Sequence, residues 1–187
     1  MSKEKERALD AYLVASARVG NRNAWRRLVE RWQPRFLGHA YRLTGDAELA
    51  RDAAQDAWAE VLRGLAGLDD VVAFPAWALR IVGRRCARLV NKQVKWRATE
   101  AALAREPDTA PEQSDSAQRD LQLTAVRGAL HSLSTEQRTA IGLFYLEEMS
   151  VAEVAVVLDV PIGTVKTRLM HARRKLRAQL ETSNEEN

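Results

Sequence analysis

The sequence predicts an all-α protein made of two small helical domains joined by a flexible linker, with a helix-turn-helix in the C-terminal domain. Three observations support this fold class. Apolar residues recur at three- and four-residue steps along most of the chain, and the alternation expected of strands is absent. Two capping boxes mark helix starts in the last third of the chain. An acidic stretch with Pro, Ser and Gln separates two basic blocks.

The first two expected helices lie before residue 45. Leu9 begins an apolar stripe whose helix should end near the polar turn at 20–23. A second stripe runs from Trp25 to Phe36, and Pro34 should kink or divide that helix because proline lacks a backbone donor.

Two further helices follow. Asp46 is the expected N-cap of a helix reaching about residue 65, whose buried face includes Leu49 and Ala57. After a loop over 66–74, Pro75 opens a helix whose inner face continues to about residue 90. Gly83 in its middle costs roughly 1 kcal/mol relative to Ala, which predicts close packing against a neighbour.

This last helix carries an unbalanced positive charge. Seven Arg or Lys residues and no acid lie between Val71 and Thr99. Four of them recur at every fourth residue, which places them in a stripe that winds slowly around the helix and suits the backbone of a nucleic-acid strand: Arg80, Arg84, Arg88 and Lys92.

The composition limits the class of protein. With 187 residues and 46% hydrophobic content, the chain can form real cores. The single cysteine, Cys86, cannot form an internal disulfide and fits no metal-ligand spacing. The N-terminus is charged where a signal peptide would be apolar, and there is no transmembrane run. We therefore expect a cytoplasmic protein with no metal, no cofactor and no membrane insertion.

The stretch 106–120 contains five acids and one Arg, and its composition is typical of a flexible tether. It divides the chain into an N-terminal domain (1–98), a linker (99–119) and a C-terminal domain (120–187). A helix over about 119–131 should open the C-terminal domain.

The C-terminal domain has the order of a helix-turn-helix. The capping boxes of Ser134 with Gln137 and of Ser150 with Glu153 predict helices starting near residues 135 and 151. A turn at 159–163 then leads into the basic segment 161–177. Asp159 occupies the turn position where glycine is common. Four apolar residues are spaced as the core of such a unit requires: Val154, Leu158, Val160 and Val165.

With Val165, Leu169 and Ala172 turned inward, the outward side of the last helix receives Lys166, Thr167, Met170, His171 and Arg174. Lysine and threonine can read base edges, and a methionine can contact a thymine methyl. Arg173, Lys175 and Arg177 suit phosphates, which position a protein without reading sequence. The alternative is a solvated helix with an incidental basic surface, on which His171 is an ordinary surface histidine.

Longer segments of the chain resemble one family. "YRLTGDAELARDAAQDAWAEVLRGL" and "FPAWALRIVGRRCARLV" resemble the core-binding and promoter-melting regions of bacterial RNA polymerase sigma factors. "LSTEQRTAIGLFYLEEMSVAEVAVVLDVPIGTVKTRLMHARRKLR" resembles their C-terminal promoter-binding domain. The resemblance covers about residues 8–98 and 120–180. With only these two domains, the chain is similar to the extracytoplasmic-function (ECF) type of the sigma-70 family.

The resemblance implies a transcription initiation factor that binds core RNA polymerase at its clamp helices and flap and directs it to promoters. Asp52, Gln55 and Asp56 match the family's "D..Q[ED]" run, which binds the clamp helices. Without the neighbouring motifs, the alternative would be preferred: the N-terminal part of a helix is enriched in acids because the helix dipole favours negative charge there. The basic stripe would face the non-template strand of the −10 element, and the loop 66–74 would hold a flipped base. The family positions that contact the −35 element are Arg138, Lys166, Thr167, Met170 and His171.

The resemblance also implies an anti-sigma factor as a partner and a monomer when free. One departure concerns Arg84, which stands where many relatives have asparagine in "RIARN". Trp77 belongs to the core by its spacing, whereas Trp96 lies beyond the apolar face and is a candidate for a base or partner contact.

Two other classes of protein compete with this interpretation. A stand-alone helix-turn-helix repressor would need a dimer interface for two half-sites, and it would leave the stripe on 80–92 unexplained. An enzyme would need a catalytic constellation, but the three histidines lie in different segments and no phosphate loop or metal cluster is evident.

Overall fold

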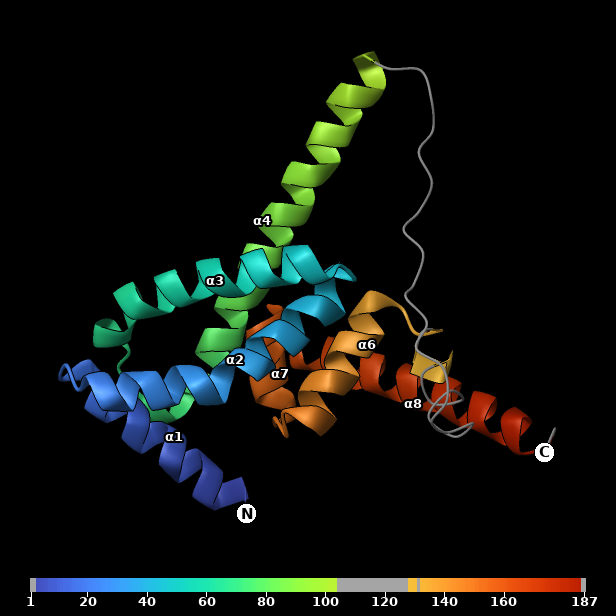
Figure 1. The fold of residues 1–187 in the computed structure, drawn as a ribbon. Helices are drawn as coiled ribbons and strands as arrows, with labels where there is room; N and C mark the ends of the chain where they lie inside the picture. The colour runs from blue at the N-terminus through green and yellow to red at the C-terminus, as the bar shows by residue number, and fades with distance from the viewer. Residues whose placement is uncertain (1–2, 104–127, 131, 186–187) are drawn as a thin grey trace.

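The computed structural model describes residues 3–103, 128–130 and 132–185, and each element within these ranges is helical (Figure 1). The predicted all-α fold class is therefore confirmed. Most of the expected linker and of the expected helix over 119–131 lies outside the described residues. The N-terminal elements are α1 (Lys3–Arg18), α2 (Arg22–Thr44), α3 (Ala47–Gly64), η1 (Leu65–Gly67), η2 (Val71–Ala73) and α4 (Phe74–Leu103). The C-terminal elements are α6 (Thr135–Ile141), η3 (Gly142–Leu146), α7 (Val151–Leu158) and α8 (Ile162–Glu185).

Helices α1 to α4 form a bundle around large aromatic side chains. Trp32 and Phe36 of α2 are almost completely buried, and the Phe74 ring meets Trp32 edge to face with centroids 5.2 Å apart. Asp46 caps α3, as predicted, because its Oδ1 accepts hydrogen bonds from the backbone of Glu48 and Leu49. Pro34 does not divide α2, which continues to Thr44, because the buried rings on either side of it hold the helix to the bundle.

A buried carboxylate fastens α1 to α2. Only 4% of the Asp10 side chain is exposed, and its Oδ1 accepts hydrogen bonds from Arg31 Nε at 2.6 Å and Trp32 Nε1 at 3.1 Å. Arg35 Nη1 lies 3.8 Å from the other carboxylate oxygen. Because a buried charge needs partners, this cluster holds α1 against α2.

Helix α4 is longer than the sequence suggests. It continues to Leu103, beyond the expected domain boundary at residue 98, and its last part projects away from the other helices (Figure 1). Gly83 is not packed as closely as predicted, since a Cβ atom there would lie 3.9 Å from His39 Nε2 and 4.0 Å from Leu43. These are ordinary contacts, so the position could accept alanine.

The C-terminal helices begin where the capping boxes predicted. Ser134 Oγ accepts from Gln137 N at the start of α6, and Ser150 Oγ accepts from Glu153 N at the start of α7, with both reciprocal bonds present. Asp159 ends α7 in the left-handed region with φ of 55°. Val165 is fully buried on the inner face of α8, which confirms the helix-turn-helix arrangement.

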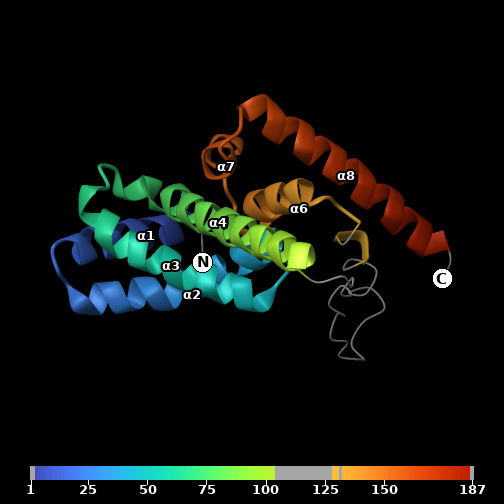
Figure 2. The ribbon, with the colours of Figure 1, turned by 90° about the horizontal axis from the view of Figure 1, so that it is seen from above.

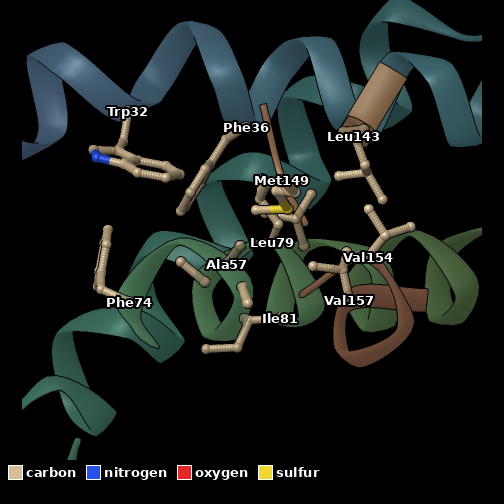
Figure 3. Close-up of a cluster of buried hydrophobic side chains, with 14 of the residues drawn as sticks. Trp32, Phe36, Ala57, Phe74, Leu79, Ile81, Leu143, Met149, Val154 and Val157 are labelled. Carbon is tan, nitrogen blue, oxygen red and sulfur yellow. The ribbon is translucent and has the colours of Figure 1, made fainter. Parts of the chain in front are cut away.

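The two units pack against each other, an arrangement that the sequence did not predict. Helix α7 lies on α4 and α6 lies on α2, so that α6 and α7 are placed between α4 and α8 (Figure 2). Buried side chains of both units form one continuous core, in which Leu143, Met149 and Val154 lie beside Phe36 and Leu79 (Figure 3). No helix in the described ranges is both long and apolar enough to cross a bilayer.

Candidate nucleic-acid interface

Helix α8 presents the outward face that the sequence predicted. Val165, Leu169 and Ala172 are buried against α6 and α7, and this orientation leaves Lys166, Thr167 and Met170 exposed, with Met170 56% exposed. His171 is half-buried. A shallow groove runs along this face, lined by Val151, Lys166, Leu169, Met170, Arg173, Arg174 and Arg177. An apolar floor with a basic rim is suited to a DNA groove, where bases are read and phosphates are neutralised.

Contacts within the unit fix several of these side chains. Arg174 Nη2 lies 3.3 Å from His171 Nδ1, and Thr167 donates its hydroxyl to Gly163 O at 3.0 Å. Arg173 lies over the rings of Phe144 and Tyr145, 5.5 and 5.6 Å from their centroids. These rings hold the Arg173 guanidinium at the edge of the groove without neutralising its charge.

Two basic side chains that sequence analysis placed near DNA have other surroundings. Lys175 donates a hydrogen bond to the Ser132 carbonyl oxygen, so this amine joins α8 to the segment before α6. Arg138 lies half-buried in α6, which packs directly on α8. Its predicted −35 contact stays a prediction.

The stripe on α4 winds around the helix, as predicted from the four-residue spacing, and its first members are paired with acids. Arg80 Nη2 donates to Asp159 Oδ1 at 2.8 Å, across the boundary between the two units. Arg84 Nη2 donates to Glu60 Oε1 at 2.7 Å. Arg88 and Lys92, farther along the helix, are exposed.

Glu60 is the acid that anchors α3 to α4. Arg85 donates to Glu60 Oε2 from Nε at 2.8 Å, in addition to the bond from Arg84. Partial burial acts to raise the pKa of Glu60, but the hydrogen bond and charge of Arg85, with the charges of Arg84 and Arg88, lower that pKa overall. The carboxylate is therefore ionised at neutral pH and neutralises the start of the stripe.

Asp52, Gln55 and Asp56 are exposed on α3, one helix away from the stripe. Asp56 Oδ2 lies 3.8 Å from Arg85 Nη1, so the acidic set lies beside α4. Gln55 also lines a shallow groove between α2 and α3.

Sequence analysis missed most of this groove. Its lining residues are Trp25, Val29, Gln33, Arg51, Gln55, Trp58, Ala59 and Leu62. Leu62 is 60% exposed, and Trp58 Nε1 donates to Gln33 Oε1 at 2.5 Å. The sequence indicates this groove only through Trp58, a large apolar residue that directly follows Ala57 of the buried face of α3. An exposed apolar surface rimmed by polar groups is typical of a protein-binding surface.

Charged pairs also cross between the units. Arg42 Nη2 donates to Glu147 Oε1 at 3.0 Å, where only 15% and 7% of the two side chains are exposed, and Arg35 Nε lies 3.8 Å from Glu147 Oε2. Arg7 Nη2 donates to Glu153 Oε2 at 3.0 Å. Burial acts to raise the pKa of Glu153, but hydrogen bonds from Ser150 and Arg7 lower that pKa overall.

Two family models match the chain in the order of its two units. The model described as sigma-70 region 2 matches residues 28–95, and the model described as sigma-70, region 4 matches residues 123–176. The first match covers α2 to α4, and the second covers the helix-turn-helix.

Relatives match almost the whole chain. The ECF RNA polymerase sigma factor SigM of Mycobacterium tuberculosis is 34% identical over 89% of this chain and 82% of its own length. The RNA polymerase sigma-H factor of Pseudomonas aeruginosa is 29% identical over 92% of this chain and 94% of its own length. Among solved structures, CnrH in complex with the cytosolic domain of CnrY is 28% identical, with a TM-score of 0.63, and the match covers 93% of this chain and 98% of that chain. The chain therefore belongs to the ECF RNA polymerase sigma factors of the sigma-70 family and is a promoter-directing transcription initiation factor.

Proposed function

We propose that three surfaces of this chain divide the work of initiation. Asp52, Gln55 and Asp56 of α3, with the adjoining α2–α3 groove, bind the clamp helices of core RNA polymerase. The stripe on α4 contacts the −10 element and aids its melting. Helix α8 reads the −35 element through its exposed face, with Arg138, Lys166, Thr167, Met170 and His171 at the family positions and Arg173 and Arg174 on phosphates.

One observation carries this proposal. Two basic surfaces suited to DNA lie on different helices of one chain, α4 and α8, beside a third surface that is acidic and apolar. A repressor uses one helix-turn-helix per half-site, so it would have no use for the other two surfaces. The chain acts, in this proposal, in the cytoplasm and without catalysing a reaction of its own.

The two units are proposed to separate when the chain acts. Separation would free the Arg80 guanidinium, at the start of the stripe, from its pair with Asp159 of the C-terminal unit. A partner that holds the units together would keep Arg80 engaged. CnrH was solved in complex with the cytosolic domain of CnrY. We extend that kind of partner to this chain and propose an anti-sigma factor that controls the equilibrium between docked and separated units.

The test is transcription from a pooled promoter library by purified full-length chain and core RNA polymerase, followed by sequencing of the run-off transcripts. Transcripts that start downstream of one shared bipartite motif are expected. The variant Lys166→Ala should change the −35 half of that motif, and Arg88→Ala should weaken transcription while the −35 half stays the same. Absence of transcripts, with DNA selection by the free chain retained, would contradict the polymerase-binding assignment.

A further inference from the structure

The far end of the α4 stripe carries an aromatic residue. Arg80, Arg84, Arg88 and Lys92 recur at every fourth position, and the next position in this series is Trp96. Its indole is 65% exposed. Tryptophan has the largest apolar surface of any side chain, so such exposure at the end of a basic stripe requires a reason.

Helix geometry places Trp96 next to the charges. Each four-residue step turns the direction of the side chain by about 40° and advances it about 6 Å along the axis. Arg88, Lys92 and Trp96 therefore span about 80° of the helix surface and about 12 Å of its length. Val94, two residues before Trp96 and also exposed at 60%, points to the opposite side of the helix.

The charge along the stripe is uneven. Arg80 and Arg84 are neutralised by Asp159 and Glu60. Arg88 acts on Glu60 through its longer-range charge, and among the described residues Lys92 forms no ion pair. The positive charge that remains to attract a polyanion is thus concentrated beside Trp96, on the part of α4 that projects from the bundle (Figure 1).

We propose that Trp96 is a stacking platform for an unpaired DNA base, with Lys92 and Arg88 holding the backbone of the same strand. Proteins that bind single strands combine a basic track with aromatic side chains on which bases stack. An isolated indole on a helix cannot stack on a base within a duplex, so the ligand is a strand already opened. This inference rests on the proposed function, because melting supplies the open strand.

The experiment measures binding of the full-length chain to fluorescein-labelled (dT)12 by fluorescence anisotropy at low salt, without polymerase. Trp96→Ala should weaken binding about tenfold, since stacking contributes that much per base. Trp96→Phe, which keeps an aromatic face, should stay within about threefold of the unmodified chain. Val94→Ala is the matched control on the opposite side of the same helix and should leave binding unchanged.

Three results would overturn the inference. The first is that the unmodified chain does not bind (dT)12. The second is that Trp96→Ala binds (dT)12 as tightly as Val94→Ala does. The third is that Trp96→Ala loses affinity equally for (dT)12 and for a 12-base-pair dA·dT duplex measured in the same assay. A lowered Tm with unchanged affinity for (dT)12 gives the second result, and it makes Trp96 a packing residue. The assay contains no polymerase, so failure of the run-off experiment does not affect its outcome, and the two failures are distinguishable.

Discussion

Replacing Glu147 with alanine should weaken the docking of the two helical units. Glu147 Oε1 lies 3.0 Å from Arg42 Nη2, and only 7% of the Glu147 side chain is exposed, so the carboxylate attracts the guanidinium by about 5.5 kcal/mol at an effective dielectric constant of 20. Desolvation offsets part of this attraction, and removing one partner of a buried pair costs about 3 kcal/mol. Arg42 Nε already lacks a hydrogen-bond partner, so the variant leaves a buried cation without compensation. A change of about 3 kcal/mol shifts the ratio of separated to docked units by roughly 150-fold.

The measurements are small-angle scattering and urea unfolding of the full-length chain. If docking is only weakly favoured in the unmodified chain, Glu147→Ala should separate the units and increase the radius of gyration. If docking is strongly favoured, the units stay together and the free energy of unfolding should fall by about 3 kcal/mol. The matched control is Glu30→Ala, which removes an exposed pair with Arg26 and should cost about 0.5 kcal/mol or less. A Glu147→Ala variant that matches this control in both measurements would refute the argument.

Four further outcomes are expected. His39 is fully buried with both ring nitrogens unpartnered, and burial followed by the charge of Arg42 lowers its pKa to about 3. Below the unfolded-state pKa of 6.5, the unfolded chain binds a proton at His39 that the folded chain does not bind. The free energy of unfolding should therefore fall by up to about 1.4 kcal/mol per pH unit as pH falls from 6.5 toward 3. His39→Leu should remove this contribution to the pH slope in urea unfolding between pH 7 and 4. Gly83→Ala should raise the unfolding free energy by roughly 1 kcal/mol, and a loss would mean that the contact with His39 is tighter than 3.9 Å. Ser150→Ala should cost about 1 kcal/mol in the same assay, because it removes the cap of α7, and no change would deny the capping box a role in stability. Arg173→Ala should reduce the log–log salt slope of promoter binding by the holoenzyme by roughly one, whereas an unchanged slope would remove Arg173 from the phosphate contacts.

The parts of the fold that could be predicted were those encoded locally. Ser134 and Ser150 carry their capping partners three residues away, so the starts of α6 and α7 are visible in the sequence. The stripe on α4 and the inward face of α8 follow from helical spacing. The docking of the two units was not visible, because pairs such as Arg42 with Glu147 join residues 105 positions apart and leave no local pattern.

Two other features of the structure could not be predicted from the sequence, for related reasons. The end of α4 at Leu103 could not be predicted because its last residues carry no apolar periodicity, and helices without such a face look like linkers. The groove beside Gln55 depends on how α2 and α3 pack, since Trp58 makes its contact with Gln33 only across that packed pair.

The docking of the two units changes the apparent affinity of the chain for its ligands. Any ligand that binds only the separated units has an apparent dissociation constant equal to the intrinsic value divided by the separated fraction of molecules. If docking is favoured by about 2 kcal/mol, the fraction is about 3%, and the affinity falls roughly thirtyfold. By reciprocity, the factor by which a bound partner specific for the docked form weakens DNA or polymerase binding equals the factor by which DNA or polymerase weakens binding of that partner. The strength of docking between the two units, which comes from their shared apolar core and from the ion pairs between them, thus sets the concentration at which this protein starts to act.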